Sequence, residues 1–160
     1  MTSPNPSKAM VWIHGDSLSI TDPALQACPE APAVFVFDEV FLSSHAIAFH
    51  RLAFMYQGVR DIARARQAEV ALCRGSMVQE ILQFAQEKGA DMVHVTRAPT
   101  AEFRRTLEGL KSAHLDVVVH EPERLTVYSR PVRRFFPFWK EVQAQVYQDA
   151  PLWDETQAPF

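Results

Sequence analysis

Five short apolar runs, separated by segments with helical periodicity, constrain the fold of this chain more than any other feature. The runs are residues 9–13, 33–37, 69–73, 92–95 and 116–119. They are rich in β-branched or aromatic residues and do not alternate cleanly with polar ones, which is typical of strands buried on both faces of a parallel sheet. One residue of each run is expected in the core: Trp12, Phe35, Val70, Val93 and Val118.

The segments between the runs carry helix signals. Asp22 followed by Pro23 predicts one helix start, because Asp caps well and Pro suits the first turn. A capping box at residues 76–79 and Gly89 predict the two ends of another helix. Thr100 predicts the cap of the next one.

The longest predicted helix begins at Ser43 or Ser44. Its apolar positions follow a spacing of about 3.6 residues and are Leu52, Met55, Tyr56, Val59, Ile62 and Ala63. The arginines expected on its outer side are Arg51, Arg60, Arg64 and Arg66.

Strands that alternate with helices predict an α/β fold of Rossmann-like type, an open five-stranded parallel sheet with helices on both faces. Residues 1–8 are expected to be a flexible N-terminus. The pattern breaks after residue 120, and a short helix is expected from about residue 137 to residue 148.

Composition narrows the function classes. The 160 residues are 48% apolar and 22% charged with a net charge of −3, so stand-alone nucleic-acid binding is not expected. Two cysteines do not make a disulfide framework. The chain has neither the apolar run of about 18 residues that a membrane helix needs nor a secretory signal pattern. A cytoplasmic protein is expected.

Catalytic and metal-binding motifs are sparse. The five glycines form neither GxGxxG nor a P-loop, and no GxSxG nucleophile elbow is present. The six histidines lack HExxH or CxxC spacing, so no metal site and no catalytic residue is predicted. The turn at residues 74–76 precedes a helix and fits either an anion site or a plain capped turn.

Topology, rather than a motif, indicates a ligand site. In open α/β sheets ligands bind beyond the carboxyl ends of strands, where the strand order reverses. The loops there contain His14, Gly15, Asp16, Ser17, Phe37, Asp38, Glu39, Thr96 and Arg97. Phe37 could pack a planar ring whose polar edge Asp38 or Arg97 would fix. The alternative is that Asp16 and Asp38 satisfy loop N–H groups and that Arg97 pairs with one of them.

The order of several short segments resembles the DNA photolyase and cryptochrome family. Residues 11–16 and 22–25 read Val-Trp-Ile-His-Gly-Asp and Asp-Pro-Ala-Leu. They are similar to the family's opening strand, Trp-Phe-Arg-Arg-Asp-Leu-Arg, and its following Asp-Asn-Pro-Ala-Leu. Further similar segments follow in the family's order at residues 34–38, 74–82, 89–94, 96–97 and 135–139.

The resemblance implies the N-terminal α/β domain of that family, with strand order 3-2-1-4-5, over residues 9–128. Residues 129–160 resemble the start of the interdomain linker. In that family this half often holds a reduced folate or a deazaflavin antenna. The resemblance does not decide which cofactor, if either, this chain binds. FAD and repair of pyrimidine dimers belong to the family's helical half and are not expected of this chain. His14, Gly15 and Leu18 stand where the family has arginines, and residues 98–100 replace its acidic and aromatic positions.

Three functions follow from these observations. The first is a non-catalytic module that binds an antenna chromophore or a nucleotide-like ligand. The second is a ligand-free interaction module that pairs with itself or with a separate helical partner, and the third is a small nucleotide-processing enzyme of a related α/β fold.

An interface is expected within residues 133–155, either in a homodimer or with a separate partner, because exposed apolar clusters usually mark interfaces. Its aromatic residues are Phe135, Phe136, Phe138, Trp139 and Trp153. The alternative is that these rings pack on their own domain.

Overall fold

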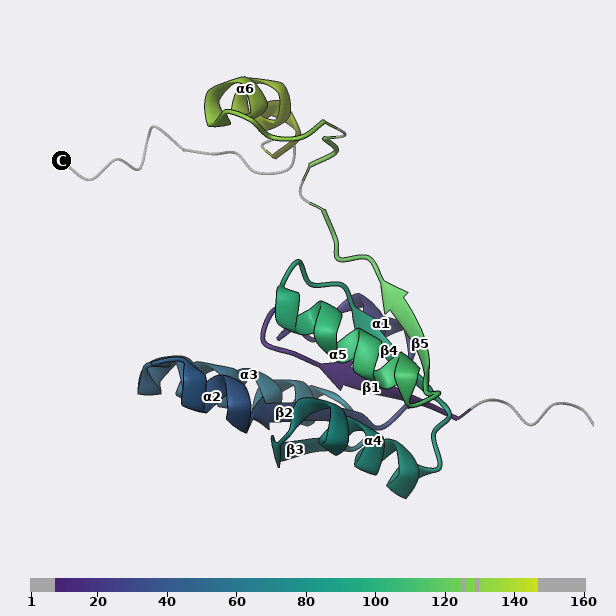
Figure 1. The fold of residues 1–160 in the computed structure, drawn as a ribbon. Coiled ribbons are helices and arrows are strands. Elements are labelled where there is room, and N and C mark those ends of the chain that lie inside the picture. Colours follow the sequence, from purple (N-terminus) through teal and green to yellow (C-terminus); the bar gives the residue numbers. More distant parts are fainter. Residues whose placement is uncertain (1–7, 125, 129, 147–160) are drawn as a thin grey trace, which may run out of the picture. The chain divides into compact units, whose positions relative to one another are not determined.

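The computed structural model describes residues 8–124, 126–128 and 130–146. The chain divides into two compact units between Pro122 and Glu123. In the first unit strands and helices alternate (Figure 1). Its strands are β1 (Ala9–Ile13), β2 (Ala33–Asp38), β3 (Val70–Gly75), β4 (Met92–Thr96) and β5 (Asp116–His120). Its helices are α1 (Pro23–Ala27), α2 (Glu39–Ser44), α3 (Phe49–Ala65), α4 (Met77–Lys88) and α5 (Ala101–Ser112).

The five strands form one parallel sheet in the order β3-β2-β1-β4-β5. The expected fold class and the strand order implied by the resemblance are therefore confirmed. The chain first winds from β1 to β3 and then returns to the other side of β1, so the order reverses between β1 and β4. At this point Val11 lies between Ala33 on one side and His94 on the other.

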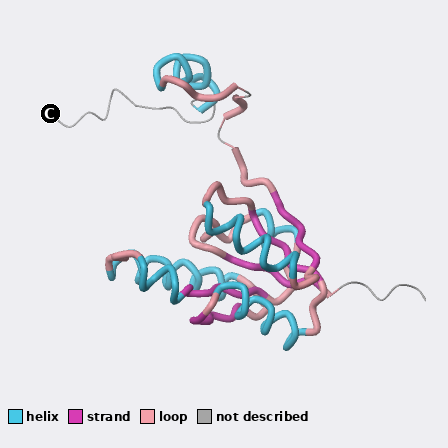
Figure 2. Tube along the Cα trace, in the orientation of Figure 1, coloured by secondary structure: helices cyan, strands magenta, loops and turns pink. Residues whose placement is uncertain are grey.

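Two cores lie on opposite faces of the sheet. Met10 and Trp12 of β1 pack in the core under α4 and α5, whereas Val11 and Ile13 pack in the core under α1 and α3. Figures 1 and 2 show these helices on either side of the strands. This alternation follows from the two-residue period of a strand, and it explains why the central strand has no polar position.

The two edge strands are less buried than the sequence predicts. Trp12, Phe35 and Val93 are buried as expected, but Val70 on β3 and Val118 on β5 are only partly buried. Both strands have a neighbour on one side only, so less of the molecule covers them. The expectation of full burial was wrong for these two residues.

Three predicted helix ends are confirmed. The Asp22 carboxylate accepts hydrogen bonds from the backbone N–H groups of Ala24 and Leu25 at the start of α1. The Thr100 hydroxyl accepts one from Phe103 at the start of α5. Gly89 ends α4 with a φ of 62°, a left-handed conformation that glycine adopts at little cost.

One predicted helix start is wrong, and the predicted start of α4 after Ser76 is confirmed but lacks the expected side-chain cap bond. Ser43 and Ser44 close α2 instead of opening a helix, because Asp38 caps an earlier start at Glu39. The longer helix, α3, begins at Phe49. Ser76 precedes α4 without a side-chain cap bond, since Asp38 also reaches that helix and accepts from Met77 N at 3.2 Å.

Arg66 turns inward, although the helical spacing predicted an outer position. It follows the last residue of α3, where the backbone leaves the helix. Its guanidinium donates to the carbonyl oxygens of Leu25, Cys28 and Ala31 at 3.2, 3.1 and 2.7 Å. Burial lowers the pKa of Arg66, an effect that the nearby Cys28 thiol opposes. Arg66 thus fixes the loop between α1 and β2.

The second unit contains α6 (Phe135–Val146). The helix starts two residues before the predicted position, and its predicted last residues lie outside the described ones. Its rings pack on one another: Phe135 stacks on Trp139 with centroids 6.0 Å apart, and Phe138 meets Tyr128 edge to face at 4.9 Å. Val142 is buried.

Arg66→Ala should lower the free energy of unfolding by roughly 2–3 kcal/mol, because three carbonyl groups lose a charged donor. Urea denaturation of the purified chain measures this change. The matched control is Arg64→Ala, whose side chain is exposed and pairs only with Asp61 on the same helix. That control should change stability by less than about 0.5 kcal/mol, and equal effects of the two substitutions would contradict the assignment.

Candidate functional site

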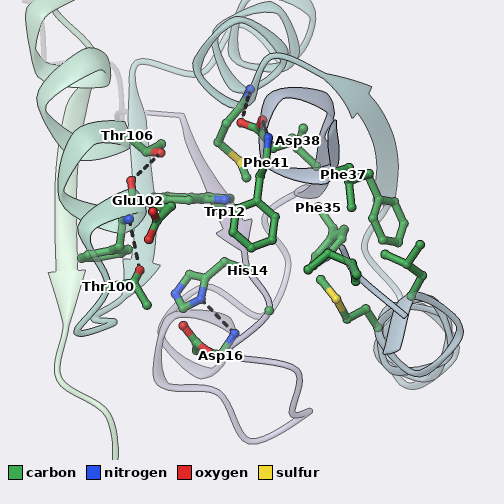
Figure 3. Close-up of a pocket in the computed structure, with 18 of the residues that line it drawn as sticks. Trp12, His14, Asp16, Phe35, Phe37, Asp38, Phe41, Thr100, Glu102 and Thr106 are labelled. Carbon is green, nitrogen blue, oxygen red and sulfur yellow. Dashed lines mark hydrogen bonds between the residues drawn. The ribbon is translucent and has the colours of Figure 1, made fainter. Parts of the chain in front are cut away.

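A cavity of about 260 Å³ opens beyond the carboxyl ends of β1 and β2 (Figure 3). Its lining comes from these strand ends, from α2, α3 and the loop between them, and from the N-terminal parts of α4 and α5. The lining residues are Trp12, His14, Gly15, Asp16, Phe35, Val36, Phe37, Asp38, Phe41, Leu42, Ile47, Arg51, Leu52, Met55, Met77, Thr100, Glu102, Phe103 and Thr106.

Aromatic rings form much of the wall. Trp12 stacks on Phe103 with ring centroids 5.6 Å apart and planes 15° from parallel. His14 meets both of these rings at an angle of 63°. On another part of the wall Phe35 and Phe37 meet edge to face at 5.1 Å. The cavity is therefore shaped by flat and rigid groups.

Trp12 also carries a buried donor without a partner. The side chain is 2% exposed, and its indole Nε1 makes no hydrogen bond within the described structure. In Figure 3 the indole nitrogen points toward the middle of the cavity. A buried polar group that lacks a partner costs about 1–3 kcal/mol, so an acceptor placed in the cavity would be stabilised here.

His14 ties the end of β1 to the end of β4. Its Nε2 donates to the carbonyl oxygen of Thr96 at 2.7 Å, and its Nδ1 accepts from the backbone N–H of Asp16 at 3.3 Å. Since both ring nitrogens are engaged, the ring presents its face and edge to the cavity rather than a free nitrogen. The Ser17 hydroxyl closes the same turn by donating to the carbonyl oxygen of His14.

Thr96 completes this closure from the other side. Its hydroxyl oxygen accepts from Ala24 N at 3.1 Å, and its carbonyl oxygen accepts from His14. These bonds occupy the crevice between β1 and β4, where the strand order reverses. The cavity consequently lies over β1 and β2 and not over the point of reversal itself.

Two of the three predicted acidic residues, Asp38 and Glu39, have structural partners for their carboxylates. Asp38 caps α2 by accepting from Phe41 N at 2.9 Å and reaches Met77 N of α4 at 3.2 Å. Glu39 pairs with Arg74 at 2.9 Å on the surface. For Asp38 the alternative interpretation, a carboxylate that satisfies backbone N–H groups, describes the contacts.

Arg97 points elsewhere than the sequence suggested. Its Nε lies 2.6 Å from a carboxylate oxygen of Glu121, and the side chain is half exposed. The pairing of Arg97 with Asp16 or Asp38, which the alternative interpretation assumed, is therefore not found.

Five of the nine predicted ligand residues line the cavity and four do not. Those that line it are His14, Gly15, Asp16, Phe37 and Asp38. Those that do not are Ser17, Glu39, Thr96 and Arg97. The residues missed are mostly helical, and the first turn of α5 could have been found. A helix that follows a parallel strand begins at the same edge of the sheet as the ligand loops.

The predicted interface residues are described only in part. Phe135 and Phe136 of α6 are exposed, whereas Phe138 and Trp139 are half-buried. Trp153 lies outside the described residues.

A second group of polar side chains lies on the α1 face of the sheet. Cys28 Sγ is 3.2 Å from His94 Nδ1, which is 2.9 Å from His120 Nε2. Burial lowers the pKa of His94, and His120 adds to this effect. Burial raises the pKa of the Cys28 thiol, although Arg66 opposes the shift. Among the described residues, no three His, Cys, Asp or Glu side chains are placed to hold a metal ion.

None of the described helices has the length and apolar character needed to cross a bilayer.

Asp38→Ala should lower the free energy of unfolding by about 1–3 kcal/mol, because one carboxylate accepts from the N-termini of two helices. Urea denaturation measures the loss. Glu39→Ala is the matched control, since Glu39 makes only a surface ion pair and should change stability little. A loss in the control as large as that in Asp38→Ala would contradict the capping role.

The unfolding free energy should fall as the pH is lowered through about 6.5. The pKa of His94 is depressed in the folded state, so the unfolded chain takes up a proton that the folded chain resists. His94→Gln should weaken this pH dependence, as followed by chemical denaturation from neutral to mildly acidic pH. His50→Gln, at an exposed position on α3, should retain it. An unchanged pH dependence in His94→Gln would refute the assignment.

The comparisons with known proteins concern both sequence and fold. A sequence model of the family described as DNA photolyase matches residues 9–158. No curated protein matches the chain.

Several solved structures are similar to part of this chain. The hypothetical protein MJ0577 has a TM-score of 0.48 and 15% identity, and the alignment covers 73% of this chain and 98% of that one. A universal stress protein in complex with cAMP has a TM-score of 0.45 and 18% identity, with coverage of 72% and 98%. The hypothetical protein PH0823 has a TM-score of 0.43 and 14% identity, with coverage of 73% and 97%. Since the family match extends over nearly the whole chain, this protein belongs to the DNA photolyase family.

Proposed function

We propose that this chain is a non-catalytic ligand-binding module of the DNA photolyase family. Its cavity takes a planar heteroaromatic ligand, either an antenna chromophore such as a reduced folate or a deazaflavin, or a nucleotide-like molecule. The proposal rests on the shape of the cavity, on the polar groups at its rim and above all on the unpartnered donor of Trp12.

The size and the walls of the cavity suit a flat ring system. Ligand sites commonly enclose about 300–1,000 Å³, and this cavity of about 260 Å³ is slightly smaller than that range. Rings such as Trp12, Phe35, Phe37 and Phe103 offer flat apolar surfaces for stacking. A ligand with a compact bicyclic or tricyclic core would fill it and leave any flexible tail outside.

The main support for a ligand in this cavity is the indole N–H of Trp12. It is buried, lines the cavity and has no partner in the described structure. Pterin, flavin-like and purine rings all carry carbonyl oxygens or ring nitrogens at their edges, and these are hydrogen-bond acceptors. Binding such an edge would satisfy the donor and fix the orientation of the ring.

Charged residues at the rim of the cavity would contact the parts of the ligand that lie outside its ring system. Arg51 lines the cavity from α3 and makes no ion pair with a described residue. Its guanidinium suits the carboxylate of a folate tail or the phosphate of a nucleotide. Glu102 and Asp16 also line the cavity and disfavour a second anionic group nearby.

Trp12→Phe keeps an aromatic ring beside Phe103 but removes the N–H donor together with the five-membered ring of the indole. We expect the affinity for a deazaflavin or a methenyl-folate to fall roughly 2- to 13-fold, the range that corresponds to about 0.5–1.5 kcal/mol for one hydrogen bond. Titration followed by ligand absorbance and fluorescence measures the change. Trp139→Phe on α6 is the matched control and should bind as the parent does.

Naphthalene, a flat ring without an acceptor, separates loss of the donor from loss of packing. It should bind the parent chain and Trp12→Phe equally well. If the deazaflavin, the methenyl-folate and a purine nucleotide such as ATP all fail to bind the parent chain at millimolar concentration, the proposed function is wrong. If they bind and Trp12→Phe is unaffected, the indole donor is not the recognition element.

A further inference from the structure

The charges of this chain are unevenly distributed. Residues 124–140 contain five cationic side chains and no aspartate or glutamate, although the whole chain has a net charge of −3. The cations are Arg124, Arg130, Arg133, Arg134 and Lys140. We call this stretch the basic segment. It belongs to the second unit, whereas every residue that lines the cavity belongs to the first, so the inference does not rest on the proposed ligand function.

Exposed apolar side chains lie within the same segment. Phe135 and Phe136, at the start of α6, are 62% and 75% exposed, and Val127 and Val132 before the helix are 81% and 56% exposed. Next to them is a surface hollow of about 470 Å³ lined by Tyr128, Arg130, Pro131, Arg133, Arg134 and Pro137. Cationic and apolar groups thus alternate over one short piece of chain.

We propose that the basic segment binds the surface of a bilayer that contains anionic phospholipids. The arginines around the hollow contact lipid phosphates, and Phe135 and Phe136 enter the boundary between headgroups and acyl chains. Clusters of basic residues beside exposed aromatic side chains bind such surfaces through electrostatic attraction and apolar burial together.

The arginines differ in how far they are already engaged. Arg130 pairs with Glu141 and lies over the Tyr128 ring, with its guanidinium carbon 5.7 Å from the centroid. Arg133 and Arg134 make no ion pair with any described residue. Within the described part of the chain, these two guanidinium groups can therefore contact phosphate oxygens without breaking an ion pair.

The packing of the rings favours a lipid surface over a nucleic acid. A nucleobase needs a free ring face on which to stack, but Phe135 stacks on Trp139 and also meets the edge of Phe136. A lipid boundary requires only exposed apolar surface. Val127 and Val132 add aliphatic surface of this kind, which contributes nothing to base stacking.

Co-sedimentation of the full chain with lipid vesicles tests the proposal. The chain should bind vesicles of phosphatidylcholine mixed with phosphatidylglycerol and should not bind phosphatidylcholine alone. Added salt should weaken the binding. Arg133→Gln with Arg134→Gln should lower the partition coefficient roughly 30-fold, and Phe135→Ser with Phe136→Ser should also lower it at least tenfold.

Matched controls come from exposed residues of the first unit. Arg104→Gln with Arg105→Gln on α5, and Phe49→Ser with Phe54→Ser on α3, remove the same groups at other exposed positions and should retain binding. Circular dichroism verifies that each variant is folded.

Three results would overturn the proposal. The first is absence of binding to the anionic vesicles, and the second is equal loss of binding in the control variants. The third is that the Phe135 and Phe136 surface serves another partner. One such result is tight binding of a single-stranded oligonucleotide that is lost in the Phe135→Ser, Phe136→Ser variant. The other is a dimer in light scattering that dissociates in the same variant.

Discussion

The burial of β1 at the centre of the sheet is the constraint on which the rest of the first unit depends. Met10, Val11, Trp12 and Ile13 are each at most 2% exposed, and they alternate between the two cores. Burial of a side chain of this size contributes about 1.5–3 kcal/mol, so the two helical layers and the sheet are stabilised together. Trp12 has a second consequence, because its place near the end of β1 puts the indole in the wall of the cavity.

The polar contacts at the strand ends decide where that cavity lies. His14 and Thr96 join β1 to β4, and this contact closes the crevice that the topology alone would assign to a ligand. Asp38 joins β2 to the N-termini of α2 and α4, and Phe41 and Met77 from these helices line the cavity. Because these hydrogen bonds close the crevice between β1 and β4, the cavity lies on the β2 side of β1, between aromatic side chains.

The fold followed from the sequence because hydrophobic periodicity is a local property, and the candidate site followed only in part because its geometry is not. All five strands lie where the apolar runs predicted them. Asp22 and Thr100 cap the starts of helices, and Gly89 caps the end of one, as expected. Long-range bonds caused the errors. Asp38 replaces Ser76 as the cap of α4, and Arg66 reaches carbonyl groups 35 to 41 residues away in the sequence. No local sequence pattern predicts such partners, and none predicts the ion pair between Arg97 and Glu121.

The net charge of the whole chain does not describe the chemistry of each part of its surface. A total of −3 describes the far field of the chain, but screening limits electrostatic interaction to about 8–10 Å at physiological salt. The five cations of residues 124–140 therefore act locally, although Glu123 and Glu141 flank them in the sequence and Arg130 already pairs with Glu141. The exposed phenylalanines beside those cations add an attraction that salt does not screen. The local combination of charge and apolar surface, rather than the average, determines which surface this part of the chain can bind.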